Sequence, residues 1–256
     1  MNNQLPPLPI GDLPNGPMTS RDLPTPSRAL VIVAHPDDAE FQCGGTLAKW
    51  AAAGCVINHL VLTDGAKGTW DPNQNSEELV ELRRAEQMEA ARRLGSTGKV
   101  VMLGHVDGEL QPTLHIRDQV AYWIRSTQPD VVLAHDPWKR YRLHPDHRHA
   151  GFLTCDAIVA ARDPHFFKEH EIAHHRPQNL LLWEADEPDH GEDVSDFVEI
   201  KISALLAHES QFESTMKAVD QQALERFAER MKHRLGELGQ RINRPAAEIF
   251  KKISDI

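Results

Sequence analysis

The chain has 256 residues, of which 40% are hydrophobic and 26% carry a charged side chain, and its formal net charge is −10. This length suits one large α/β domain or at most two small ones, and the composition is not that of a disordered chain. The sequence has no basic stripe or aromatic-interleaved arginine patch, and no apolar run approaches the ~20 residues that span a bilayer, so nucleic-acid binding and a membrane span are excluded.

The first 27 residues are predicted to lie outside the folded domain. Met1–Pro26 is rich in proline and glycine, and it lacks a basic segment followed by an apolar one. It is therefore not expected to be a signal peptide, and a disordered or surface-hugging arm is the better interpretation. Residues 28–256 are then expected to form a single domain.

The cysteine content favours a reducing environment. Cys43, Cys55 and Cys155 include no CxxC pair. Three cysteines do not build a disulfide framework in a chain of this length. We therefore expect buried, reduced thiols and a cytoplasmic location.

Short β-branched runs alternate along the chain with segments of helical period. The predicted strands are 29–34, 56–62, 99–103, 131–134, 180–183 and 197–200, and the predicted helices are 46–53, 76–94, 116–126 and 146–161. Strands that alternate with helices indicate right-handed βαβ units. The expected fold is an α/β, Rossmann-like three-layer sandwich, in which a mostly parallel sheet has helices on both faces.

The C-terminal third has two further patterns. Eight acidic residues and no Lys or Arg fall between Glu184 and Glu199, which predicts a solvated acidic loop. From Phe212 onward, apolar residues recur at steps of three and four, which predicts a long amphipathic helix from about 205 to 240. We expect that helix to cover the sheet, with packing in an oligomer interface as the alternative.

Polar residues directly follow four of the predicted strands. They are His35, Asp64, His105 with Asp107, and His135 with Asp136. In open parallel sheets, ligands bind outside the carboxyl ends of the strands. The sequence therefore predicts a polar site at that edge of the sheet.

Two clusters at this edge have the composition of a metal site. In HPDD at 35–38, the histidine and the last aspartate are three residues apart at a predicted helix start, so their side chains share a face. Imidazole and carboxylate ligands suit Zn²⁺ or a similar divalent ion, and catalytic zinc usually has three protein ligands and one open position. The last histidine of HPDH at 144–147 is the natural third ligand. The predicted ligands are therefore His35, Asp38 and His147.

The other polar residues of these motifs are predicted to carry the chemistry. Asp37 lies beside the metal without binding it and can take a proton from metal-bound water. His144 can stabilise an oxyanion as an imidazolium or protonate the leaving amine, and Asp146 can orient a histidine through its ring N–H. As alternatives, the aspartates could cap a helix, and HPDH could be a polar loop. Further candidate ligands, for which a structural or solvent-facing role is preferred, are His135, His149, His174 and His175.

These motifs resemble those of the LmbE-like, or PIG-L, family of zinc-dependent N-acetylglucosamine deacetylases. The resemblance covers most of the chain and is carried by AHPDD at 34–38 and HPDH at 144–147. The supporting motifs are Gly44-Gly45, Thr63-Asp64-Gly65, Arg83-Arg84-Ala85-Glu86, Asp107-Gly108 and His208-Glu209-Ser210-Gln211. It implies an LmbE-like deacetylase domain over residues 28–256.

The resemblance also implies roles for individual residues. It implies zinc, or another divalent metal such as Fe²⁺, held by His35, Asp38 and His147, with Asp37 as general base and His144 as the oxyanion or acid group. It further implies that Arg83 or Arg84 and Asp107 contact the sugar.

The chain departs from the family pattern in two places. Many members have glutamate where Ala39 stands, and Glu40 is the nearest acid. Some members use a tyrosine shortly before HPDH, and Tyr141 is one residue away from the expected spacing. Trp138, in the same loop, could stack on a sugar or an aromatic acyl group, or be an ordinary surface aromatic.

The predicted function is hydrolysis of the linear amide of an N-acetylated or N-acylated amino sugar, or of a sugar conjugate, by zinc-activated water. The alternatives are an amidase for a non-sugar N-acyl small molecule and a non-catalytic sugar- or metal-binding module on the same fold. A nucleotide-binding Rossmann domain is weaker, because the first loop is acidic and has no GxGxxG motif. The choice of N-acyl substrate and a homo-oligomeric state both stay open.

Overall fold

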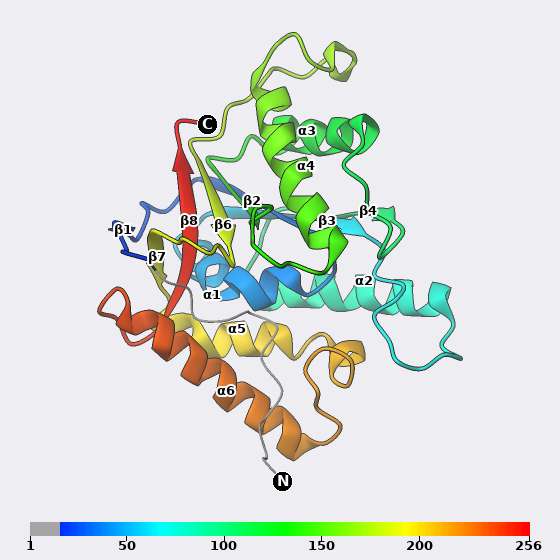
Figure 1. Cartoon of the computed structure of the whole chain (residues 1–256), viewed down its shortest axis with the longest axis vertical. Helices are drawn as coiled ribbons and strands as arrows, with labels where there is room; N and C mark the ends of the chain where they lie inside the picture. Colours follow the sequence, from blue (N-terminus) through cyan, green and yellow to red (C-terminus); the bar gives the residue numbers. More distant parts are fainter. Residues whose placement is uncertain (1–15) are drawn as a thin grey trace.

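The computed structural model describes residues 16–256, so residues 1–15 of the predicted arm lie outside the described part. Its centre is an eight-stranded sheet with the strand order β1-β7-β8-β6-β5-β2-β3-β4 (Figure 1). The strands are β1 (Ser20–Arg21), β2 (Arg28–Val33), β3 (Val56–Thr63), β4 (Val100–His105), β5 (Val131–His135), β6 (Asn179–Trp183), β7 (His190–Asp193) and β8 (Ala247–Ser254). The α-helices are α1 (Asp38–Ala52), α2 (Ser76–Arg93), α3 (Leu114–Thr127), α4 (Pro145–Arg162), α5 (Val198–Leu205) and α6 (Gln221–Gln240). The 3₁₀ helices are η1 (Lys168–His170), η2 (Ser195–Phe197) and η3 (Glu209–Gln211).

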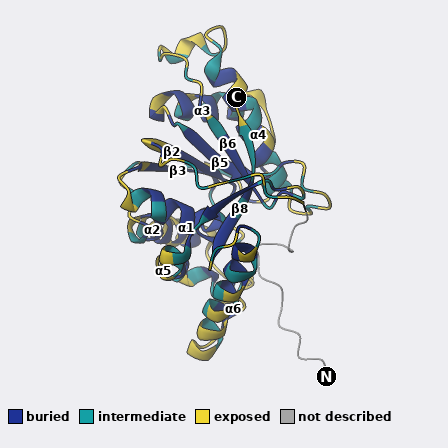
Figure 2. Cartoon of the chain, turned by 90° about the vertical axis from the view of Figure 1, so that its left-hand side faces the viewer, coloured by how far each residue is buried: buried dark blue, intermediate teal, exposed yellow. Residues whose placement is uncertain are grey.

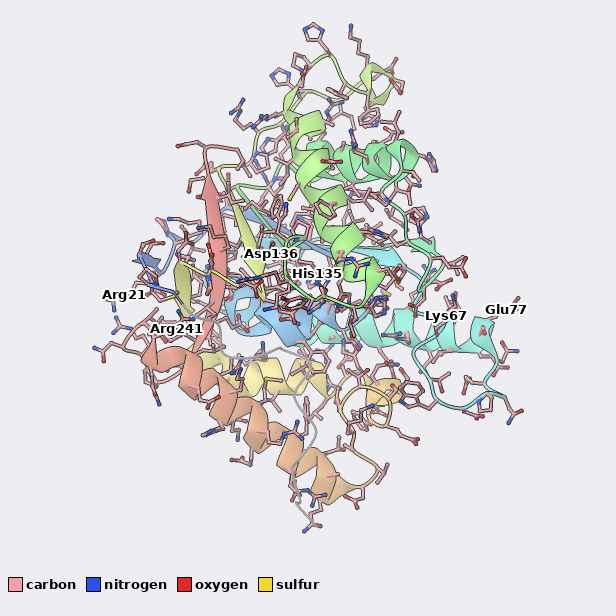
Figure 3. All side chains as sticks on the ribbon, in the orientation of Figure 1. Arg21, Lys67, Glu77, His135, Asp136 and Arg241 are labelled. Carbon is pink, nitrogen blue, oxygen red and sulfur yellow. The ribbon has the colours of Figure 1, made fainter. Side chains whose placement is uncertain are left out.

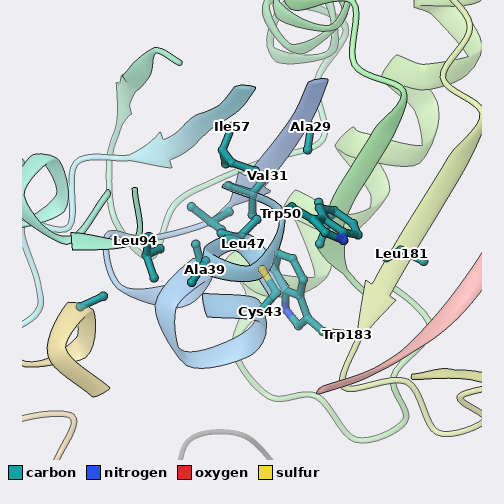
Figure 4. Close-up of a cluster of buried hydrophobic side chains, with 14 of the residues drawn as sticks. Ala29, Val31, Ala39, Cys43, Leu47, Trp50, Ile57, Leu94, Leu181 and Trp183 are labelled. Carbon is teal, nitrogen blue, oxygen red and sulfur yellow. The ribbon is translucent and has the colours of Figure 1, made fainter. Parts of the chain in front are cut away.

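Helices cover both faces of the sheet, which confirms the predicted three-layer α/β sandwich. Neighbouring strands are parallel except at β8, which is antiparallel to β6 and β7. Val31 and Val33 of β2 join the apolar cluster that contains α1 (Figure 4), whereas Leu30 and Ile32 join the cluster that contains α3 and α4. This alternation buries both faces of the central strands (Figure 2).

The predicted helix from about 205 to 240 is wrong in its first half. Helix α6 begins only after Asp220, whose side chain accepts the Ala223 N–H at 2.7 Å. The segment before it consists of η3 and turns. Phe212 and Met216 match the helical period, yet they pack from this irregular segment into the same apolar cluster as α6. The period identified the buried residues but not the backbone that carries them.

The acidic stretch from Glu184 to Glu199 is not the solvated loop that was predicted. Its middle forms β7, and the predicted strand at 197–200 is instead the end of η2 and the start of α5. Glu192 is 0% exposed, and Lys49 of α1 donates to it at 2.8 Å. A buried carboxylate needs such a partner. Nothing in the local sequence places Lys49 beside it.

The described part of the predicted arm and the cysteines can also be placed. Within the predicted arm, Ser20–Arg21 forms β1 and pairs with β7 at one edge of the sheet. Cys43, Cys55 and Cys155 are free thiols. Among residues 16–256, no helix combines the length and apolar character that crossing a membrane requires.

The carboxyl ends of β2, β3, β4 and β5 meet at one edge, because these strands are parallel and lie next to one another. The loops that follow them are 34–37, 64–75, 106–113 and 136–144. These loops lead into α1, α2, α3 and α4. The predicted polar site therefore lies at the edge where ligands bind in such sheets.

Candidate metal centre and active site

The HPDD segment at 35–38 forms a tight turn between β2 and α1. The backbone N–H of His35 donates to Asp38 Oδ2 at 2.8 Å, which holds this carboxylate against the end of the strand. Asp37 has a φ of 94°, a conformation that residues other than glycine rarely adopt. The Asp37 side chain makes no capping hydrogen bond to α1, so the helix-cap interpretation of this residue is wrong.

Side-chain atoms of His35, Asp38 and His147 form a compact triangle. His35 Nδ1 lies 3.1 Å from His147 Nε2 and 3.6 Å from Asp38 Oδ2, and His147 Nε2 lies 3.3 Å from Asp38 Oδ1. Ligand atoms bound at ~2.1 Å around a tetrahedral ion are about 3.4 Å apart. Two imidazole nitrogens and a carboxylate group are also a donor set that divalent ions accept. The three residues could therefore hold such an ion.

Two carboxylates hold the other ring nitrogen of His35. Its Nε2 lies 3.1 Å from Asp107 Oδ1 and 3.0 Å from Asp146 Oδ2. Burial would raise the pKa of Asp107, but the hydrogen bond and charge of His35 lower it to about 2. An ionised carboxylate only accepts hydrogen bonds, so Nε2 carries a proton. Burial would lower the pKa of His35, but hydrogen bonds to Asp107, Asp146 and Asp38 raise it well above its usual value, so a divalent ion that binds at Nδ1 must displace the second ring proton. Asp146 thus lies where a residue that orients a metal-binding histidine is needed.

His135 belongs to this site, although the sequence favoured a structural or solvent-facing role for it. It is buried at the end of β5 (Figure 3), and its Nε2 lies 3.2 Å from Asp38 Oδ2. The indole N–H of Trp183 donates to His135 Nδ1 at 3.0 Å. Burial lowers the pKa of His135 and keeps the ring neutral, so its proton lies on Nε2 and points at Asp38.

Three groups of side chains bring ligand atoms within 4.8 Å of one another: His35, His144 and His147; Asp38, His135 and His147; and His35, Asp107 and Asp146. The Trp183 N–H occupies Nδ1 of His135, and Nε2 of this ring faces Asp38. We therefore assign His135 to orienting Asp38, and the HPDD and HPDH motifs favour His35 and His147 as ligands.

Asp37 lies beside the triangle and is buried against α2. Its backbone N–H donates to Gln87 Oε1 at 3.0 Å, and Arg83 Nη2 lies 3.5 Å from its Oδ2. Burial raises the pKa of Asp37 to about 6, with Arg83 opposing the rise and Asp38 adding to it. A carboxyl group that titrates close to neutral pH suits a general base.

Of the two predicted arginines, only Arg83 reaches the site. Its guanidinium is buried and donates to two backbone carbonyls at 2.7 and 2.8 Å. Gly68 provides the space for it, because a Cβ at this position would lie 2.2 Å from Arg83 Nη1. Arg84 lies half-exposed on α2, where its Nε is 3.6 Å from Glu81.

The HPDH side of the site differs from the prediction in two respects. His144 stacks on His147, and burial, together with the charges of His35 and His147, lowers the pKa of His144 to about 4. Near neutral pH the ring is therefore neutral and is not the imidazolium that was predicted. Tyr141 is 93% exposed and lies outside the cavity, so it is not placed to contact substrate.

Arg142 is the charged residue of this loop that reaches the site. It donates to His147 Nδ1, and its Nη2 lies 2.5 Å from Glu184 Oε2. The neutral His147 ring then carries its proton on Nε2, and a divalent ion that binds at this nitrogen displaces that proton. Glu184 belongs to the acidic stretch, so the partner could not be read from the local sequence. A basic residue two positions before HPDH was the available signal.

The other polar residues that follow strands make local contacts. Asp64 Oδ1 accepts the N–H groups of Ala66 and Asp107 at 3.0 and 3.1 Å. His105 Nε2 lies 2.7 Å from the side chain of Gln119, and Asp136 Oδ1 accepts the Trp138 N–H at 2.9 Å. These residues shape loops and do not reach the triangle.

A cavity of about 360 Å³ opens over the triangle. It is lined by His35, Asp37, Asp38, Phe41, Gln42, Lys67, Gly68, Arg83, Asp107, Gly108, His144, His147, Gln211 and Thr215. Gln211 comes from the HESQ motif at 208–211 and donates to Gly68 O at 3.0 Å. Glu86 accepts both the N–H and the hydroxyl of Ser210, at 2.7 and 2.6 Å. This motif therefore closes one wall of the cavity against α2.

Comparison with known proteins gives a consistent answer. The family described as "PIG-L: GlcNAc-PI de-N-acetylase" matches residues 30–158. A diacetylchitobiose deacetylase of Thermococcus kodakarensis is 38% identical over 188 residues, which are 72% of this chain and 70% of that protein. A 1D-myo-inositol 2-acetamido-2-deoxy-alpha-D-glucopyranoside deacetylase of Actinosynnema mirum is 29% identical over 54% of this chain and 57% of its own length.

Solved structures extend the likeness to the whole fold. The N,N'-diacetylchitobiose deacetylase of Pyrococcus horikoshii superposes with a TM-score of 0.81 and 30% identity, over 90% of this chain and 84% of that chain. GalB, a 4-carboxy-2-hydroxymuconate hydratase of Pseudomonas putida, has a TM-score of 0.71 at 20% identity, which is a likeness of fold alone. The matched motifs, the fold and the relatives together show that this chain is an N-deacetylase that belongs to the PIG-L, or LmbE-like, family.

Proposed function

We propose that this enzyme uses zinc to hydrolyse the N-acetyl group of an N-acetylglucosamine unit in a small sugar or sugar conjugate. The single observation that carries the proposal is the buried Asp37 carboxylate beside the triangle of His35, Asp38 and His147, at the base of an open cavity. A metal-binding module needs residues that bind the metal, but it has no need of a second carboxyl group that does not bind the metal and titrates near neutral pH. The names of the relatives, which act on diacetylchitobiose and on an N-acetylglucosaminyl inositol, support the substrate class.

In this proposal, His35, Asp38 and His147 hold the zinc ion. Zinc in such a site polarises the acyl carbonyl and lowers the pKa of its water to roughly 7. His135 orients Asp38, and Asp146 orients His35, so that both can bind the metal. These contacts prepare the ligand set before substrate arrives.

Asp37 takes the proton of the attacking water and returns a proton to the leaving amine. Its position against Arg83 and Gln87 keeps the carboxyl group within the site, and burial brings its pKa to about 6. At neutral pH the group is therefore mostly ionised and able to accept a proton. His144 is neutral at the mouth of the site and donates a hydrogen bond to the oxygen on which negative charge develops.

Two further residues are proposed to face the sugar. Asp107 lines the cavity. Its carboxylate, which contacts His35, also accepts the backbone N–H of Lys67 at 3.0 Å. Lys67 lines the same wall and can donate to sugar hydroxyl groups. Arg83 lines the cavity and donates hydrogen bonds to two backbone carbonyls. We therefore assign it to holding the turn at residues 35–38 in place.

The test is acetate release from a panel of compounds by protein reconstituted with Zn²⁺ or with Fe²⁺. The panel contains diacetylchitobiose, an N-acetylglucosaminyl inositol, an N-acetylglucosaminyl malate and a non-sugar N-acetyl amine. We expect turnover of at least one sugar compound, and a loss of roughly 100- to 10,000-fold in kcat for Asp37→Asn with zinc content retained. Turnover of the non-sugar amine alone, or full activity of Asp37→Asn, would contradict the proposal.

A further inference from the structure

A buried row of polar side chains runs behind Asp37, on the side away from the cavity. Gln87 of α2 accepts the Asp37 N–H at 3.0 Å and donates from Nε2 to Glu40 Oε1, also at 3.0 Å. The second oxygen of Glu40 lies 3.4 Å from His208 Nε2. Gln87, Glu40 and His208 are each 0% exposed, and none of them lines the cavity.

Glu40 decides which way the Gln87 amide points. Its carboxylate oxygens serve as acceptors, so the NH₂ group of Gln87 must face Glu40 and the carbonyl must face Asp37. With the amide turned over, Nε2–H would meet the Asp37 N–H and leave buried donors unsatisfied, at a cost of about 1–3 kcal/mol for each group. The hydrogen bond to Asp37 therefore depends on the carboxylate behind it.

The Asp37 backbone needs such support. A residue with a Cβ at a φ of 94° is in a sparsely populated conformation, which persists only where the surroundings hold it. The Asp37 N–H precedes α1 and has no partner within the helix. Gln87 supplies that partner, while Phe41 N–H holds the Asp37 carbonyl at 3.1 Å. The two contacts fix both sides of the residue that carries the carboxyl group.

We propose that Gln87, oriented by Glu40, is a positioning residue that holds the Asp37 carboxylate in the geometry needed for proton transfer. This inference rests on the proposed function, in which Asp37 is the general base. Gln87 itself touches neither the ligand triangle nor the cavity. Its effect should therefore appear in the chemical step and not in substrate or metal binding.

The first test is Gln87→Met, which keeps the length and helix preference of the side chain but removes both hydrogen bonds. We expect kcat to fall roughly 10- to 100-fold, because a displacement of about 1 Å can cost that much, while KM and the Kd for Zn²⁺ stay at the wild-type values. Gln119→Met is the matched control. Gln119 of α3 makes its hydrogen bond with His105 of β4 and with no member of this row, so its variant should keep the wild-type kcat.

The second test exchanges the two partners and remains decisive if Gln87→Met does not fold. Gln87→Glu alone sets two carboxylates against each other. Adding Glu40→Gln restores a hydrogen bond between the two positions, in which the new glutamine at position 40 donates to the new glutamate at position 87. The Asp37 N–H still meets an acceptor, because it faces the carboxylate at position 87. We expect the double variant to recover roughly tenfold in kcat over Gln87→Glu, as a coupled pair does in a double-mutant cycle.

Four outcomes decide the inference. Lower kcat with unchanged KM and zinc affinity, together with recovery in the exchanged pair, supports it. Wild-type kcat in folded Gln87→Met overturns it. Parallel losses of melting temperature, zinc affinity and kcat also overturn it, because they assign Gln87 to the fold alone. If the wild type releases no acetate, or Asp37→Asn keeps full activity, the proposed function fails as well, and those two measurements do not involve Gln87.

Discussion

Replacing Trp183 by phenylalanine removes a single polar contact two steps away from the ligand triangle. The indole N–H of Trp183 donates to His135 Nδ1 at 3.0 Å, and His135 Nε2 lies 3.2 Å from Asp38 Oδ2. Without the indole, only the hydrogen bond to Asp38 keeps the His135 proton on Nε2. If the proton moves to Nδ1, the lone pair of Nε2 faces the Asp38 carboxylate and repels it.

The size of the effect follows from the contacts that change. Residues that orient metal ligands contribute roughly 10- to 100-fold to metal affinity. That range corresponds to about 1.4–2.7 kcal/mol at 1.36 kcal/mol for each factor of ten. Trp183 is 1% exposed, so the variant also loses packing, and its free energy of unfolding falls independently of the metal. A control must separate these two losses.

Trp50 provides that control within the same apolar cluster (Figure 4). It is 0% exposed, and its indole N–H has no hydrogen-bond partner among the described residues. Trp50→Phe therefore loses a similar volume but no contact to the site. Competition with a chromophoric chelator measures the Kd for Zn²⁺ in both variants. We expect a weaker Kd in Trp183→Phe only, and equal zinc affinities in the two variants would refute the reasoning.

Three other predictions address the turn, the buried histidine and the metal. Gly68→Ala places a Cβ 2.2 Å from Arg83 Nη1, so the guanidinium should be displaced and kcat/KM should fall. In the control Gly236→Ala, the nearest atom to the new Cβ lies at 3.6 Å, and wild-type kinetics should be retained. Burial lowers the pKa of His59, so the unfolded chain binds more protons than the folded protein below pH 6.5, and the free energy of unfolding should fall with pH there. In chemical denaturation from pH 7 to 5.5, His59→Gln should show a smaller fall than the wild type, and equal slopes would contradict this origin. Raising free Zn²⁺ to 100 times its Kd should stabilise the folded protein by about 2.7 kcal/mol, and a melting temperature independent of Zn²⁺ would argue against the site.

The order of strands and helices could be predicted from the sequence because the hydrophobic period of each segment, and the alternation of strand and helix segments along the chain, are local properties. The βαβ pattern predicted a mostly parallel sheet covered on both faces, and the structure confirms it. The errors lie where tertiary contacts override the local pattern. Met216 is buried and Phe212 is partly buried although turns carry them, and Glu192 is buried in β7 because Lys49 reaches it from α1.

The sequence alone determined the family, the sheet edge that carries the site and the candidate ligands His35, Asp38 and His147, because these follow from motifs at the ends of strands. The tertiary structure decided how those side chains are held. Trp183, Gln87 and Glu184 are far from HPDD and HPDH in sequence, and they come beside the site only through strand pairing and helix packing. Hydrogen-bond direction and burial, which set tautomers and pKa values, are properties of these contacts and cannot be read from a motif.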